Sequence, residues 1–179
     1  MKEFHKNEYV VYANTGICII EDICPLPFSG KGEDLLYYVL KPLSNAYSTL
    51  YIPTNNEALR SKMRSVLTKE EIDDLLVHIK DQQLPWIEEK NARTDYCRKV
   101  LSEGNQQELL LLVSCMYVKK QEREAAGKKL PFADENVLKS IENLVGQEFA
   151  FSLGIPEEKV EKYIQDRLEI SRDGGNRLD

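Results

Sequence analysis

The sequence has none of the short motifs that accompany common nucleotide-binding and acyl-transfer enzymes. It contains no GxxxxGK[ST] phosphate loop and no GxSxG nucleophile turn. Gly30-Lys31-Gly32 is the nearest approach to a glycine-rich phosphate loop, but it leads toward an expected strand rather than a helix. We therefore expect no enzymatic activity, no catalytic residues and no small-molecule substrate.

Metal-binding motifs are scarce as well. The cysteines form no CxxC pair, and the histidines lie apart from them; these residues are Cys18, Cys24, Cys97, Cys115, His5 and His78. A zinc site needs clustered thiolates or imidazoles, so we expect no metal and no cofactor. Such isolated cysteines are typical of reduced, mostly buried thiols in a cytoplasmic protein.

Long apolar runs and an excess of positive charge are both missing. No stretch approaches the ~20 apolar residues needed to cross a bilayer, so we expect a cytoplasmic chain without membrane contact. The formal net charge is −6, and it is spread evenly: 9 basic and 12 acidic residues lie up to Gln83, and 15 and 18 after it. Domains that bind nucleic acid by charge alone are usually basic, so DNA binding by this chain alone should be weak.

Up to about residue 55 the sequence predicts short strands. Runs of β-branched and aromatic residues lie at 9–12, 17–23, 35–40 and 49–52, and turn signals rich in Gly, Pro and Asn separate them. Short strands at close spacing favour a small SH3- or Tudor-like β-barrel over βαβ units.

After residue 55 the apolar spacing becomes helical. Residues 56–65 predict a short helix, and Thr68 followed by Glu71 predicts a capping box that begins another. Leu84-Pro85-Trp86 then breaks the pattern. Further helices are expected over 87–101, 106–126 and 134–153 and after Pro156, with Gly104, Gly127 and Gly154 just past the ends of the first three.

We thus predict a two-domain α+β protein. A β-barrel domain is expected over residues 1–55 and a bridging helical segment over 56–83. A C-terminal all-α helical domain is expected over 84–170, followed by a frayed polar tail over 171–179.

Three features suggest binding rather than catalysis. The strand at 49–52 can pair with another protein's sheet if it lies at an edge, although the pattern also fits a strand paired on both sides. Trp86, the only tryptophan, follows Pro85 at the expected domain junction. A rigid indole can wedge into a DNA minor groove, and a lone tryptophan at a junction is also typical of interdomain core.

The third feature is a set of basic residues around the end of the expected helix 106–126. It consists of Lys119, Lys120, Arg123, Lys128 and Lys129. Cations at this place stabilise a helix C-terminus, and they can also contact phosphates.

The ordered set of motifs resembles the CarD-type regulators. The likeness rests on Tyr9-Val10-Val11-Tyr12, Tyr38-Val39-Leu40-Lys41, Tyr51-Ile52-Pro53, Pro85-Trp86-Ile87, Leu101-Ser102-Glu103-Gly104-Asn105, Gly127-Lys128-Lys129-Leu130 and Glu148-Phe149-Ala150. A similar N-terminal module occurs in transcription-repair coupling factor, where a motor domain would follow. The helical half separates this chain from that factor.

The resemblance implies a bacterial, non-enzymatic transcription regulator with two partners. In this family the β-barrel docks on the β subunit of RNA polymerase through an edge strand, which here corresponds to Ser48, Thr49, Leu50, Tyr51, Ile52 and Pro53. The helical domain reaches promoter DNA at the upstream edge of the transcription bubble and stabilises the open complex. The matching DNA-binding residues are the wedge Trp86 and the basic residues Arg93, Lys119, Lys120, Arg123, Lys128 and Lys129. The alternative is an adaptor that binds RNA polymerase without touching DNA.

Two positions depart from the family pattern. Many members carry an arginine in the edge strand, where this chain has Tyr51, so backbone pairing stays possible while a salt bridge is lost. Many also carry an arginine three residues after the tryptophan, where this chain has Glu89, which makes Arg93 the nearest basic candidate.

Overall fold

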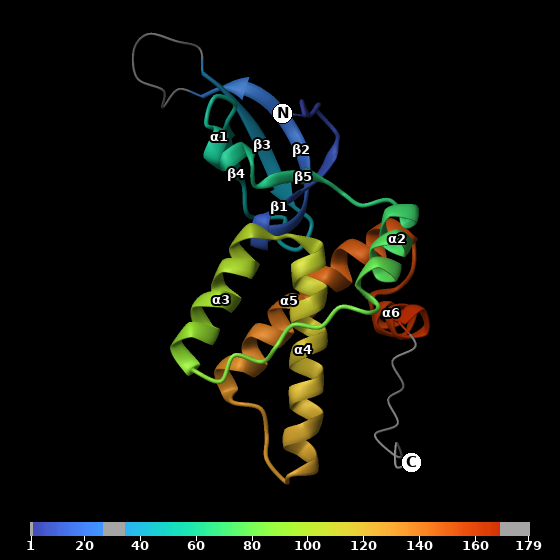
Figure 1. Cartoon of the computed structure of the whole chain (residues 1–179). Helices are drawn as coiled ribbons and strands as arrows, with labels where there is room; N and C mark the ends of the chain where they lie inside the picture. The colour runs from blue at the N-terminus through green and yellow to red at the C-terminus, as the bar shows by residue number, and fades with distance from the viewer. Residues whose placement is uncertain (1, 27–34, 169–179) are drawn as a thin grey trace. The chain divides into compact units, whose positions relative to one another are not determined.

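The computed structural model describes residues 2–26 and 35–168, which divide into two compact units (Figure 1). The first unit is Met1–Val66 and the second is Leu67–Asp179. Strands lie in the first unit and the long helices in the second, so the predicted α+β order is confirmed in broad terms. The predicted frayed tail at 171–179 lies outside the described residues.

The first unit is a curled antiparallel sheet of five strands in the order β4-β3-β2-β1-β5. The strands are β1 (Tyr9–Tyr12), β2 (Gly16–Pro25), β3 (Leu36–Pro42), β4 (Leu50–Pro53) and β5 (Met63–Ser65). A bulge shifts the register of β2 against β3 between Ile20 and Asp22, and bulges increase the bend of a strand. Since β4 and β5 are the two ends of this order, the sheet is a half-barrel and the predicted barrel is not closed.

One face of this sheet carries the core of the first unit. The strands alternate inward and outward side chains, and the inward ones are mostly β-branched or aromatic. The buried cluster on this face consists of Phe4, Val10, Cys18, Ile20, Tyr38, Leu40, Ile52 and Met63.

The predicted helix over 56–65 is wrong in its second half. A single turn, α1 (Glu57–Arg60), begins after Asn56, whose side chain accepts the Leu59 N–H. The chain then forms β5, which pairs with β1 and buries Met63 in the sheet core. The first unit therefore extends beyond residue 55, the predicted end of the β-domain.

The second unit packs its helices around one core. The helices are α2 (Lys69–Ile79), α3 (Lys90–Glu103), α4 (Gln106–Ala125), α5 (Phe132–Leu153) and α6 (Val160–Leu168), with a 3-10 turn (Glu157–Lys159) before α6. In Figure 1, α3, α4 and α5 lie side by side. The core includes Ile72, Leu76, Ile79, Val100, Leu109, Met116, Leu138, Ile141, Val145 and Phe149. Because α2 contributes to this core, the predicted bridging segment 56–83 is split between the two units.

The predicted stops of the long helices are confirmed. Gly104 and Gly154 follow α3 and α5 in the left-handed conformation, with φ of 66° and 64°. Gly127 has φ 70°, two residues after α4 ends. Glycine adopts this conformation without the steric cost that other residues carry.

The predicted capping box at the start of α2 is confirmed, and it gives a testable stability effect. Thr68 Oγ1 accepts the Glu71 N–H at 3.2 Å, and Glu71 Oε2 accepts the Thr68 N–H at 2.8 Å. Thr68→Ala removes the first bond and should lower the free energy of unfolding by about 1 kcal/mol in urea denaturation. Thr94→Ala, which alters a half-exposed threonine inside α3, is the control and should cost less. Equal urea concentrations at the unfolding midpoint for wild type and Thr68→Ala would contradict this prediction.

Candidate functional site

β4 is an edge strand. It pairs with β3 through Tyr37↔Pro53, Tyr38↔Ile52, Val39↔Tyr51 and Leu40↔Leu50, and no second strand among residues 2–26 and 35–168 pairs with it. Of the two arrangements that the sequence left open, the structure shows the unpaired edge.

The pairing with β3 fixes which backbone groups of β4 point outward. The Thr54 N–H donates to the Leu36 carbonyl at 2.9 Å, so Thr54 directs its backbone groups at β3. Backbone groups alternate sides along an antiparallel strand, so Ile52 and Leu50 also face β3. Tyr51 lies between them and directs its N–H and carbonyl away from the sheet.

The outward edge of β4 is short. Beyond Tyr51, the carbonyl of Pro53 accepts the Asn56 N–H at 3.2 Å, and proline has no N–H to offer. On the other side, the Ser48 N–H donates to the carbonyl of Asn45 at 3.1 Å. The alternation therefore leaves Thr49 and Tyr51 as the residues of the predicted segment 48–53 that can pair with a further strand.

Exposed apolar and aromatic side chains lie on β4 and in the connection that leads into it. Tyr51 is 48% exposed, Leu43 is 50% exposed and Tyr47 is fully exposed in the β3–β4 connection. Ile52, by contrast, is buried in the core of the unit. Aromatic residues are enriched in protein interfaces, so these side chains suit a protein partner. Sequence reasoning missed Leu43 and Tyr47, because the only signal was their apolar character in a polar connection.

Trp86 lies in the second unit, in the irregular connection between α2 and α3. Its ring is partly buried against the core of that unit. Two cations lie over the ring: Arg93 Cζ is 4.5 Å and Lys119 Nζ is 5.6 Å from its centroid. Cation–π contacts at such distances are attractive and restrict the ring.

The structure gives Arg93 a role other than the predicted phosphate contact. Arg93 is only 8% exposed, and its guanidinium forms a two-bond pair with Asp134, from Nε to Oδ1 at 3.0 Å and from Nη2 to Oδ2 at 2.9 Å. Nη1 donates to the carbonyls of Ile87 and Glu88 at 2.8 and 3.1 Å. Hydrogen bonds to Asp134 raise the pKa of Arg93. Because the guanidinium N–H groups of Arg93 already donate to Asp134, Ile87 and Glu88, this side chain is not available to contact a DNA phosphate.

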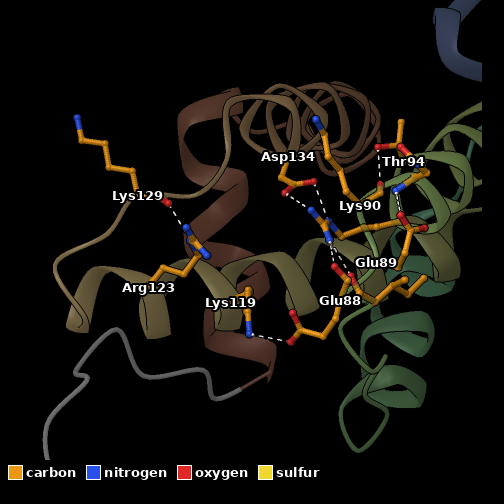
Figure 2. Close-up of polar contacts among 11 residues, drawn as sticks. Glu88, Glu89, Lys90, Thr94, Lys119, Arg123, Lys129 and Asp134 are labelled. Atoms are coloured by element: carbon orange, nitrogen blue, oxygen red, sulfur yellow. Dashed lines mark hydrogen bonds and ion pairs between the residues drawn. The ribbon is translucent and has the colours of Figure 1, made fainter.

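The two carboxylates after Trp86 both have partners inside the chain (Figure 2). The Glu89 side chain accepts the N–H groups of Asn91 and Ala92 and begins α3, which explains why this helix starts at Lys90 rather than at the predicted residue 87. The backbone bond from Ala92 lowers the pKa of Glu89. Glu88 lies 3.5 Å from Lys119 Nζ.

Some of the predicted basic residues are bound to other groups of the chain, and others are exposed to solvent. Lys119 is paired with Glu88 and, at 3.2 Å, with Glu122; the hydrogen bond with Glu122 is the main reason that its pKa is raised. Arg123 Nε donates to the Lys129 carbonyl at 2.8 Å and holds the loop after α4. Lys128 and Lys129 are exposed, and in Figure 2 the Lys129 side chain extends away from the helices. Lys120 is half-buried.

Asp134 is a site residue whose role sequence reasoning did not foresee. It is buried in the first turn of α5, where the helix dipole also favours a carboxylate. Its acidic character at a helix start was visible in the sequence, but its pairing with a residue 41 positions earlier was not.

The described residues form no cluster suited to a metal ion, and two of the cysteines have raised pKa values. Within residues 2–26 and 35–168, no group of three or more His, Cys, Asp or Glu could hold a metal ion. The cysteines are free thiols, and burial raises the pKa of Cys18 and of Cys97 to about 11, so both are protonated at neutral pH. No described helix has the length and apolar character needed to span a membrane.

Comparison with known proteins found a match in the N-terminal part of the chain. Residues 4–67 match the family model described as the CarD-like/TRCF RID domain. The match supports an RNA polymerase-interacting transcription factor. The search of curated proteins gave no match.

Proposed function

We propose that this chain is a transcription regulator that binds the β subunit of RNA polymerase by adding β4 to a polymerase sheet. The observation that carries the proposal is the outward edge at Tyr51, in a unit that matches the model of a polymerase-interacting family. A partner strand gains main-chain hydrogen bonds there, and flanking side chains supply specificity.

The local geometry limits how a polymerase strand would dock. Thr49 and Tyr51 each offer one N–H and one carbonyl to a new neighbour, and the turn after Pro53 ends the edge. The contact is therefore short, and we expect the exposed side chains of Leu43 and Tyr47, in the β3–β4 connection, to add apolar area to it. No arginine is needed for this mode of binding, because backbone groups make the bonds.

We further propose that the helical unit stabilises the promoter open complex at the upstream edge of the bubble. Trp86 and the exposed Lys128 and Lys129 are the residues that would contact DNA there, and Lys119 would join them when a phosphate displaces Glu88. The net charge of −6 makes this contact weak in isolation, so polymerase must supply the local concentration. To shift the equilibrium, the chain must bind the open state better than the closed one, and a difference of about 1.4 kcal/mol changes the ratio tenfold.

The lifetime of the open complex on a purified promoter tests this role. Wild type should lengthen the lifetime, and both Trp86→Ala and Lys129→Glu should reduce that effect. Lys139→Glu is the matched control, because it makes the same charge change at an exposed position on α5 outside the basic set. If Lys129→Glu and Lys139→Glu behave alike, the proposed phosphate contact is absent.

The pairing of Glu88 with Lys119 predicts a gain of function. The Glu88 carboxylate lies where it competes with a DNA phosphate for the Lys119 ammonium. Glu88→Gln should therefore strengthen the effect on the open complex by less than about tenfold, and the gain should shrink as salt increases. Glu103→Gln, which removes the same charge beside Lys99 on α3, is the control and should have no effect. A weaker effect of Glu88→Gln than of wild type would contradict the competition.

A polymerase-bound adaptor without DNA contact is the second candidate. It is favoured by the partial burial of Trp86 and the internal pairing of Arg93. A promoter footprint that is identical for wild type and Trp86→Ala would support the adaptor and exclude the wedge.

A further inference from the structure

The segment that carries Trp86 is attached to two helices by one buried side chain. Arg93, in the first turn of α3, bonds the carbonyls of Ile87 and Glu88, which directly follow Trp86. The same guanidinium stacks on the Trp86 ring at 4.5 Å and is paired with Asp134 of α5. The Trp86 ring, the backbone that follows it and Asp134 of α5 are thus all in contact with one guanidinium.

We infer that the Arg93–Asp134 ion pair is a positioning device for Trp86. The pair orients the guanidinium, and the guanidinium orients both the indole and the backbone beside it. This inference rests on the proposed function, because the position of Trp86 matters for promoters only if Trp86 contacts DNA. Arg93 itself touches no partner in this account, so it is a positioning residue.

The energetics of buried ion pairs support this role over a purely stabilising one. Taking two charges out of water costs about as much as their attraction returns, and a well-packed apolar pair of similar volume is often equally stable. Arginine differs from such a pair in its planar fork, which makes several directed bonds at once. Here those bonds go to the segment of Trp86 as well as to Asp134.

The double variant Arg93→Met/Asp134→Leu separates positioning from stability. It removes both charges together, so no unpaired charge stays buried and the fold is expected to remain, as far-UV circular dichroism can check. Since Trp86 is the only tryptophan, its fluorescence reports on this place alone. We expect a changed emission maximum, stronger quenching by acrylamide and lower anisotropy than in wild type. Unchanged quenching and anisotropy in the folded double variant would overturn the inference.

Two further variants complete the fluorescence experiment. Arg93→Lys keeps the charge, but a lysine cannot bond Asp134 and both carbonyls at once. It should therefore increase acrylamide quenching and lower the anisotropy of Trp86, and this holds as a test even if the double variant fails to fold. Arg98→Met is the matched control on the same helix, because Arg98 pairs with Asp95 at 2.9 Å on the exposed surface. It should leave the emission of Trp86 unchanged.

Open-complex lifetimes then connect position to function. The double variant should lose as much of the effect on lifetime as Trp86→Ala does, while its retention by RNA polymerase stays at the wild-type level. Suppose that Trp86→Ala shortens the open-complex lifetime on a given promoter. If the double variant then has a mobile Trp86 by fluorescence but the wild-type open-complex lifetime, the inference is also overturned. If Trp86→Ala itself has no effect, the proposed DNA contact fails, and the positioning is then judged on fluorescence alone.

Discussion

Asp134→Ala is expected to lower the free energy of unfolding by roughly 3–5 kcal/mol, one of the largest effects of a single change in this chain. The substitution leaves the Arg93 guanidinium buried, at 8% exposure, without its carboxylate. A buried charge without its counter-ion costs far more than the intact pair contributes, because the bonds that Arg93 keeps with the carbonyls of Ile87 and Glu88 do not replace both its water and its carboxylate.

Urea denaturation of the whole chain measures this loss of stability, which is expected in the unfolding of the second unit, where Arg93 and Asp134 both lie. Asp95→Ala is the control, since Asp95 pairs with Arg98 where both side chains are more than two-thirds exposed, and exposed pairs contribute little. The double variant Arg93→Met/Asp134→Leu should recover most of the loss. A midpoint for Asp134→Ala that equals that of Asp95→Ala would show that Arg93 does not depend on its partner.

Tyr51→Pro is expected to weaken retention by RNA polymerase by roughly tenfold or more while the sheet stays folded. The Tyr51 N–H points away from β3, so proline removes no bond of the sheet, and edge strands tolerate proline at such positions. A polymerase strand that pairs at this edge would lose a hydrogen bond and meet the proline ring.

Two matched variants make the result specific. Tyr51→Val keeps the backbone N–H and should retain most of the binding if the backbone makes the contact. Leu50→Pro removes an N–H that faces β3 and should destabilise the first unit itself. Pull-down of the purified polymerase measures retention, and equal retention of Tyr51→Pro and wild type would exclude strand addition at Tyr51.

The features of the fold that the sequence predicted are those with a local physical cause. The capping box of Thr68 and Glu71 and the left-handed stops at Gly104 and Gly154 depend on a few neighbouring residues, and the structure confirms them. The start of α3 was wrong by three residues, because a glutamate cap at Glu89 was not considered.

The features that sequence reasoning missed depend on contacts far along the chain. β5 has three residues and no strand-like alternation of its own, and it exists because Met63, Arg64 and Ser65 pair with β1 more than fifty residues earlier. The open half-barrel follows from the same strand order, which no local pattern encodes.

The candidate site shows the same division. The sequence named Tyr51 and Trp86, but it left open whether β4 was an edge strand, and only the strand order settles that. It assigned Arg93 to phosphate because a basic residue near a tryptophan suits DNA, and it could not foresee a buried carboxylate supplied by α5.

Hydrogen–deuterium exchange at Tyr51, with and without RNA polymerase, tests strand addition most directly. In the free chain the amide of Tyr51 should exchange rapidly, while the neighbouring Ile52 amide, directed at β3, exchanges slowly. On binding polymerase the Tyr51 amide should become protected and Ile52 should stay as it was. A chain that is bound to polymerase while Tyr51 exchanges as fast as in the free protein would contradict the account.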